Sequence, residues 1–333
     1  MRISLRCALF GAALVAPVLV NPSTGRAALT LTLAGVTDGF NLSLFVDEVP
    51  ATGFCCGPLG IATNSGGQVV LQVYQNTNYL FKDVDNQHFS ANLGGASPPF
   101  TATSYGMAIT NSGGTLYAGN HDLSGGLFKL TSSGASAGIV PGSGSGIAGH
   151  GISTNPVTGH IVSAADSGIY DTNPATGVST LIVGIGSVDG VSVSADGKTV
   201  YGATGGHVIG WNYAGTQVYD SGGLGSPDGT GVIAGSTIFA GDVVSNGNDG
   251  NVWLLNPTTG INTLIATGGS RGDYVGTDST NGSLFLTQTD LVDRLTCGPG
   301  CTFVTTPTPE PASLLLFAPA LIGLGALHRR RVV

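Results

Sequence analysis

The chain has 333 residues, of which 55 are glycine and only 9% are Asp, Glu, Lys or Arg. Because 41% of the residues are apolar and few are charged, the composition excludes an intrinsically disordered protein, and its richness in glycine disfavours a helical one. Residues 28–308 hold 18 acidic and 5 basic residues, a net charge of −13, which argues against nucleic acid or anionic lipid as a partner. An all-β protein with many tight turns is what this composition favours.

Residues 1–27 have the pattern of a secretory signal peptide. Arg2 and Arg6 supply positive charge, residues 7–20 form an apolar run, and small residues surround a cleavage site after Ala27. A buried core helix is the alternative interpretation. We expect the chain to be exported through the Sec translocon, which leaves a mature body.

That body, residues 28–305, contains six copies of one pattern. Each copy has a strand of small apolar residues, a polar turn that contains glycine, and a strand of β-branched or aromatic residues. The copies begin at Gly60, Gly106, Gly151, Gly190, Gly231 and Tyr274, at intervals of 46, 45, 39, 41 and 43 residues. A second hairpin follows most of them, with turns such as Asn-Pro-x-Thr-Gly whose glycine supplies a positive φ. Each unit is therefore predicted to form four short strands.

A period of about 43 residues with four strands per unit is typical of a β-propeller. One four-stranded sheet cannot bury both of its faces, whereas a radial array of such sheets can. We predict an all-β fold with six four-stranded blades, because six units nearly fill the body. A β-solenoid or two sandwiches are the alternatives, although solenoid coils repeat at about 20–30 residues.

The innermost predicted strands open with glycine, a hydrophobic residue and then Ala or Ser, as at Ala62, Ala108, Ser153 and Ser192. This pattern resembles the NHL and YVTN-type β-propellers, and small residues suit strands that crowd around an axis. Residues 40–48 are also strand-like. We expect them to pair with the last blade and close the ring, with a partial seventh blade as the alternative.

Acidic residues recur where the innermost strands begin. The residues before these strands are Leu59, Tyr105, His150, Asp189, Asp228 and Asp273, and the loops between second and third strands carry Asn120, His121, Asp122, Asp166, Asp242 and Asp290. Both sets would lie on one face of a propeller, so His150, Asp189, Asp228 and Asp273 are expected at one mouth of the channel. Such ligands suit Ca²⁺. The alternative is that the Asp-Gly pairs only form turns.

Two short segments match the sequence patterns of a catalytic motif and a nucleotide-binding motif. Residues 268–272 match the nucleophile elbow and residues 144–149 match a dinucleotide-binding loop, but no helix follows either one, and both motifs require it. We therefore predict no catalytic residue.

Four cysteines remain after removal of the signal peptide: Cys55, Cys56, Cys297 and Cys301. An even number in an exported protein favours disulfides. A bond between Cys297 and Cys301 would close a hairpin of the last blade. Cys55 and Cys56 would form a vicinal ring or bond with the C-terminal pair. A zinc site is the alternative, but no C-x-x-C spacing supports it.

Residues 306–333 form a third region with the features of a sorting signal. The motif Pro309-Glu310-Pro311 precedes an apolar stretch at 312–327, and Arg329, Arg330 and Arg331 follow. This order resembles the PEP-CTERM signal of Gram-negative bacteria. The resemblance implies a transmembrane helix with a cytoplasmic arginine cluster, cleavage by an exosortase, and release to the cell surface or matrix. A permanent tail anchor is the alternative.

Together these features predict an exported binding protein of the cell surface or exopolysaccharide matrix rather than an enzyme. Its expected partners are the exosortase and matrix polysaccharides or proteins, and it would touch the membrane only through its C-terminal segment. The alternative is a calcium-dependent hydrolase, since gluconolactonase-like and regucalcin-like enzymes resemble this chain in fold. Those enzymes place a metal-binding glutamate near the first inner strand, and here Glu48, the one glutamate of the body, lies before the repeats.

Overall fold

The structure is a computed structural model that describes residues 28–51, 57–73, 77–96, 106–120, 126–144, 146–147, 149–235 and 238–297. The predicted signal peptide and the predicted sorting signal lie outside these residues, and both stay predictions. In the described part of the chain, no helix is long and apolar enough to cross a membrane.

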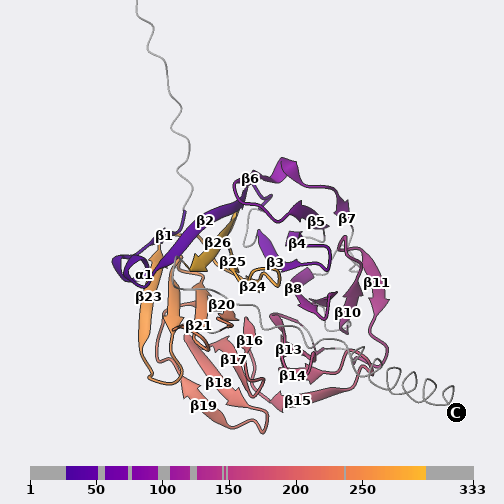
Figure 1. The fold of residues 1–333 in the computed structure, drawn as a ribbon. Helices are drawn as coiled ribbons and strands as arrows, with labels where there is room; N and C mark the ends of the chain where they lie inside the picture. The colour runs from indigo at the N-terminus through magenta and orange to yellow at the C-terminus, as the bar shows by residue number, and fades with distance from the viewer. Residues whose placement is uncertain are drawn as a thin grey trace, which may run out of the picture.

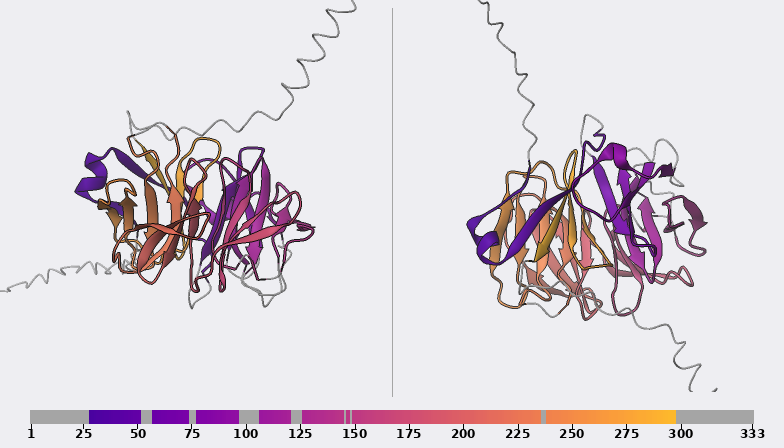
Figure 2. Two further views of the ribbon diagram at one scale, coloured as in Figure 1. Left: turned by 90° about the horizontal axis from the view of Figure 1, so that it is seen from below. Right: turned by 45° about the horizontal axis from the view of Figure 1, so that its top comes forward.

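Six sheets surround a central axis, seen end-on in Figure 1 and from the side in Figure 2. The first blade consists of β3 (Pro58–Thr63), β4 (Gln68–Val73), β5 (Thr77–Lys82) and β7 (Gly95–Ala96). The second consists of β8 (Gly106–Ser112), β9 (Thr115–Asn120), β10 (Phe128–Leu130) and β11 (Ser136–Ile139). The third consists of β12 (Ile152–Thr154), β13 (Ile161–Ala165), β14 (Gly168–Thr172) and β15 (Ser179–Val183).

The other three blades continue around the ring. The fourth consists of β16 (Val191–Val193), β17 (Thr199–Thr204), β18 (His207–Asn212) and β19 (Gln217–Asp220). The fifth consists of β20 (Pro227–Val232), β21 (Val243–Gly247), β22 (Val252–Leu255), β23 (Asn262–Thr267) and β1 (Thr30–Leu31). The sixth consists of β24 (Val275–Thr277), β25 (Leu284–Thr287), β26 (Val292–Cys297), β2 (Phe40–Asp47) and β6 (Gln87–His88). The predicted six-bladed propeller is confirmed.

The N-terminal segment closes the ring. β2 pairs antiparallel with β26, from Phe40 opposite Cys297 to Val46 opposite Val292, and so supplies the fourth strand of the sixth blade. This confirms the role predicted for residues 40–48 and excludes the partial seventh blade. Two further contacts were not predicted: β1 joins the fifth blade, and β6 pairs in parallel with β2. A short helix, α1 (Leu33–Thr37), connects β1 to β2, and a 3-10 turn (Phe89–Ala91) follows β6.

The repeated turns form because asparagine side chains accept hydrogen bonds from backbone N–H groups within the turn. Oδ1 of Asn155 accepts hydrogen bonds from the N–H groups of Val157 and Thr158, at 2.9 and 3.2 Å. Asn173 and Asn256 bond in the same way to the second and third residues after them. The glycines that end these turns have φ values of 72–73°, which suits glycine far better than any other residue.

Glycines also set the distance between neighbouring blades. A β-carbon on Gly190, beside β16, would lie 2.2 Å from the carbonyl oxygen of Asp228 in the next blade. A β-carbon on Gly151 would lie 2.5 Å from the carbonyl oxygen of Asp189. The innermost strands therefore pack backbone against backbone, and the residue before each glycine is held close to its counterpart in the next blade.

A buried arginine lies where the first and last blades meet. Arg294, on β26, forms ion pairs with Asp278 at 2.9 Å and Asp85 at 2.8 Å, and a third with Asp83. Its guanidinium also lies over the rings of Phe45 and Phe285, 5.2 and 4.7 Å from their centroids. Because Asp83 and Asp85 lie in the segment that follows β5 of the first blade, this cluster joins the two ends of the ring.

Candidate functional site at the channel mouth

The blade topology divides the loops between two faces. We call the face that carries the loops leading into the innermost strands, and the loops between second and third strands, the mouth face; the opposite side is the rear face. His150 lies just before β12 and Asp189 just before β16. Asp228 is the second residue of β20, and Asp273 lies just before β24. All four predicted residues therefore lie on the mouth face.

His150 contacts carboxylates from its own blade and the next. Its Nε2 lies 2.8 Å from Oδ1 of Asp166, in the loop between β13 and β14, and its Nδ1 lies 3.5 Å from Oδ1 of Asp189. The side chain of His150 is 16% exposed, whereas that of Asp189 is 49% exposed. The imidazole is therefore held at the edge of the channel with its ring orientation fixed by Asp166.

A second group of side chains lies around Arg271, in the loop between β23 and β24. Its Nε lies 2.5 Å from Oδ1 of Asp273, and one terminal nitrogen lies 3.9 Å from Oδ2 of Asp228. The same oxygen of Asp228 accepts a hydrogen bond from Nδ2 of Asn248 at 2.8 Å. The side chains of Asp228 and Asp273 are only 9% and 7% exposed, so Arg271 links two buried carboxylates.

The carboxylates repel one another despite the arginine. Burial, and then the negative charges of Asp189 and Asp273, raise the pKa of Asp228 well above its ordinary value. Burial raises the pKa of Asp273 to about 6, while the opposing effect of Arg271 limits the rise. Oδ2 of Asp273 is buried and has no hydrogen-bond partner among the described residues. The channel mouth therefore holds more negative charge than Arg271 alone offsets.

This excess of buried oxygen ligands fits a divalent cation. Hard carboxylate oxygens are what Ca²⁺ prefers, and a cation would relieve both the mutual repulsion and the unpartnered Oδ2 of Asp273. The ligand atoms of the mouth residues do not, however, all lie within 4.8 Å of one another. Among the described residues, the group whose ligand atoms lie within 4.8 Å of one another is Asp47, Glu48 and His88, at the outer edge of the sixth blade.

Several residues singled out in the sequence do not contribute to this site. Leu59 is buried in the core, with 7% of its surface exposed. Asp242 was predicted on the mouth face, and this is wrong: it directly precedes β21, which places it on the rear face. The fifth repeat is displaced because its second strand starts at Val243, whereas residues 238–240, read from the sequence as strand, form a turn.

Other predictions concern positions that the structure does not cover. The described residues do not include the sorting signal or Tyr105, His121, Asp122, Cys55, Cys56 and Cys301. Of Asn120 and Cys297, only the backbone is described. The disulfide prediction and its alternatives therefore stay predictions.

Arg271 and Asn248 are site residues that the sequence did not predict. Arg271 is one of two arginines between residues 28 and 305, and that rarity in an acidic body was the available signal. It was read only as part of the string 268–272. Asn248 gave no comparable signal, since asparagine is common in turns throughout this chain.

Tyr274 closes the channel beneath the mouth. Its hydroxyl lies 2.8 Å from the carbonyl oxygen of Ile109 and 2.9 Å from that of Ile152, and it donates its proton between them. Tyr274 precedes β24 in the sixth blade, whereas Ile109 and Ile152 belong to the second and third blades. The side chain therefore spans the axis and separates the mouth from the space behind it.

Three solved structures show the same architecture. A gluconolactonase from Xanthomonas campestris aligns with a TM-score of 0.57 and 12% identity, over 80% of this chain and 94% of that protein. A putative glucose dehydrogenase from Thermus thermophilus aligns with a TM-score of 0.53 and 14% identity, over 77% and 100%. A protein of unknown function from Bacteroides thetaiotaomicron aligns with a TM-score of 0.56 and 11% identity, over 77% and 75%.

No protein-family model matches the chain, and no curated protein matches it in sequence. At 11–14% identity, the structural matches establish a shared fold and do not by themselves establish an activity. The chain is thus a six-bladed β-propeller similar in fold to gluconolactonase and glucose dehydrogenase-like proteins.

Proposed function

We propose that this propeller is a calcium-dependent hydrolase of lactones or related esters, with its active site at the channel mouth. One observation carries the proposal: the carboxyl groups of Asp228 and Asp273 are buried at the channel mouth with raised pKa values, the charge of Asp189 contributes to both shifts, and Oδ2 of Asp273 has no hydrogen-bond partner among the described residues. Strongly perturbed carboxylates in a cleft are typical of functional sites. The similarity in fold to a gluconolactonase supports the reaction class.

In this proposal Asp189, Asp228 and Asp273 would hold the cation. A bound divalent cation would polarise the carbonyl group of an ester and favour the ionisation of a nearby water. Arg271 and Asn248 hold Asp273 and Asp228 in place through the contacts described above. They position the ligands without touching the substrate.

His150 is the candidate proton acceptor. In the tautomer in which Nε2 donates its hydrogen to Asp166, Nδ1 is the nitrogen that would accept a proton. Nδ1 faces Asp189 at 3.5 Å, next to the proposed cation. His150 would take the proton of the attacking water at Nδ1 and deliver it to the departing alkoxide oxygen.

The test is a calcium titration by calorimetry together with lactone and ester hydrolysis followed in a pH-stat. We expect the parent protein to bind one Ca²⁺ and to hydrolyse a lactone, and Asp228→Asn to lose both properties. Asp242→Asn is the matched control, because Asp242 is as buried as Asp228 but lies on the rear face. As whole residues, Asp242 is 6% and Asp228 is 7% exposed. Absence of binding and hydrolysis in the parent, or hydrolysis that survives Asp228→Asn, would overturn the proposal.

We also propose that the protein acts outside the cytoplasm. The predicted signal peptide at 1–27 and the resemblance of residues 306–333 to a PEP-CTERM signal support export, exosortase cleavage and release to the surface or matrix. Replacing Arg329, Arg330 and Arg331 by alanine is expected to leave an uncleaved, membrane-associated form. Cell fractionation and the mass of the mature chain measure this, and unchanged processing would contradict it.

A further inference from the structure

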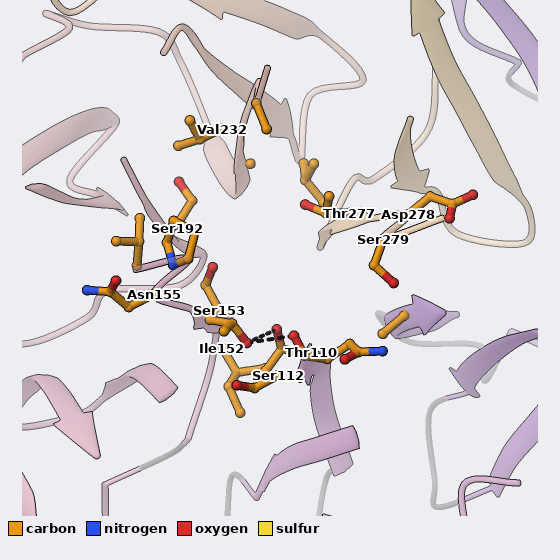
Figure 3. Close-up of a pocket in the computed structure, with 18 of the residues that line it drawn as sticks. Thr110, Ser112, Ile152, Ser153, Asn155, Ser192, Val232, Thr277, Asp278 and Ser279 are labelled. Carbon is orange, nitrogen blue, oxygen red and sulfur yellow. Dashed lines mark hydrogen bonds between the residues drawn. The ribbon is translucent and has the colours of Figure 1, made fainter. Parts of the chain in front are cut away.

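A cavity opens on the rear face, behind Tyr274. Its volume is about 400 Å³, within the range of roughly 300–1,000 Å³ of small-molecule sites. Every blade contributes to its wall through the end of its innermost strand: Ile61, Thr110, Ser153, Ser192, Thr230 and Thr277. Figure 3 shows labelled side chains from five of the blades surrounding the opening. We call this space the rear cup.

The rear cup is closed at its inner end. Tyr274 lines it and spans the axis, held by the carbonyl groups of Ile109 and Ile152. The phenol is 5% exposed, and burial raises its pKa above the ordinary range, so it stays protonated and keeps donating. A ligand can therefore enter only from the rear face, and the cup is separate from the mouth with its carboxylates.

Two hydroxyl groups on the wall lack a hydrogen-bond partner among the described residues. Oγ of Ser192 and Oγ1 of Thr230 belong to residues that are 3% and 2% exposed. A buried hydroxyl without a partner is unfavourable, so both hydroxyls would gain by turning towards a ligand that supplies hydrogen bonds. Neighbouring hydroxyls are already engaged: Thr110 bonds to Thr154 at 2.9 Å.

The rear cup is neutral. Among the described residues that line it there is no lysine, arginine or histidine, and the carboxylate belongs to Asp278. Arg294 pairs with that carboxylate at 2.9 Å, and the side chains of Thr280 and Asn281 donate hydrogen bonds to it. The cup therefore offers no net attraction to an anion or a cation.

Apolar side chains alternate with the hydroxyls around the wall. The lining residues include Ile109, Ile152, Val193, Val232 and Val275. A sugar ring has the complementary surface, with hydroxyl groups at its edge and C–H groups on its faces. Neutral polyols and carbohydrates are the small molecules that match a wall of this kind.

We propose that the rear cup binds the terminal unit of a neutral carbohydrate. Ser192 and Thr230 donate to or accept from the sugar hydroxyls, and apolar groups of the wall, such as the half-buried side chain of Val232, pack against the ring. Because Tyr274 blocks the inner end, the cup takes a free sugar or the end of a chain and does not thread an internal segment. This site is independent of the hydrolase proposed at the mouth.

The experiment uses the purified full-length protein with neutral hexoses (glucose, galactose and mannose) and their linear oligomers, measured by calorimetry. We expect binding at one site per chain, with oligomers bound about as tightly as single units. Removing both unpartnered hydroxyls by Ser192→Ala and Thr230→Val should weaken binding about tenfold or more. The same double variant should melt no lower than the parent, because two unsatisfied buried groups are gone.

Asp228→Asn at the mouth is the matched control and should leave carbohydrate binding unchanged. Carbohydrate binding that is lost in Asp228→Asn but kept in the Ser192/Thr230 double variant would place the ligand at the mouth and overturn the proposal. Absence of binding to every neutral sugar tested would overturn it as well. Failure of lactone hydrolysis would not affect it, so the two proposals are tested separately.

Discussion

Replacement of Arg294 by methionine would remove the cation from the cluster that joins the first and last blades. The side chain of Arg294 is 7% exposed, and those of Asp278 and Asp83 are 0% and 15% exposed. Deleting one partner of a buried ion pair costs about 3–5 kcal/mol, because the remaining charge is left without compensation. Methionine keeps contact with Phe45 and Phe285, so the loss reports the charge more than the packing.

The expected change is large enough to measure directly. A loss of about 3–5 kcal/mol corresponds to a melting temperature roughly 6–20 °C lower, at about 2–4 °C per kcal/mol for a domain of this size. Burial already raises the pKa of Asp278. Without Arg294 that pKa would rise further, so the folded variant holds its proton to higher pH than the unfolded chain. The deficit should therefore be greatest near neutral pH and shrink towards pH 4.

Denaturant unfolding at pH 7 and pH 4 provides the assay. Asp278→Asn in the Arg294→Met background should restore part of the loss, since it removes the uncompensated carboxylate. Lys198→Met is the control for an exposed pair: Lys198 is 81% exposed and 3.8 Å from Asp196, and its removal should change stability by less than about 1 kcal/mol. If Arg294→Met costs no more than Lys198→Met, the cluster does not stabilise the closed ring.

Three further substitutions test a buried carboxyl group and two contacts near the axis. Burial raises the pKa of Asp293 to about 7, and its Oδ2 has no hydrogen-bond partner among the described residues. The folded protein therefore loses stability as pH rises from about 4 to 7. Above pH 7, Asp293→Asn should be more stable than the parent by about 2–4 kcal/mol, and near pH 4 the two should not differ. Urea unfolding at both pH values measures this difference. Gly190→Ala would place a β-carbon 2.2 Å from the carbonyl oxygen of Asp228, and should cost about 1–3 kcal/mol in thermal unfolding; an unchanged melting temperature would refute the close approach. Tyr274→Phe leaves the carbonyl groups of Ile109 and Ile152 without their donor and should cost about 1–3 kcal/mol by denaturant titration, whereas equal stability would show that the hydroxyl does not hold the channel closed.

The sequence by itself determined the architecture, because a propeller is built from local information. Turn signals such as Asn155 to Gly159 and a period near 43 residues depend on backbone preferences within one blade. The closing role of residues 40–48 followed from a strand left over outside the six units. His150 and Asp189 could be placed on one face for the same reason, since every innermost strand runs in the same direction. The fifth blade was misread where an irregular loop replaces the repeat, and this put Asp242 on the wrong face.

Only the tertiary structure decided what surrounds these residues. Tyr274 bonds to Ile109 across 165 positions of sequence, and Arg294 pairs with Asp83 across 211. Arg271 reaches Asp228 because the loop before β24 folds over the neighbouring blade. Such contacts depend on how the six blades close around the axis, and no local pattern encodes that. The blind rear cup and the charge balance of the mouth are consequences of this closure.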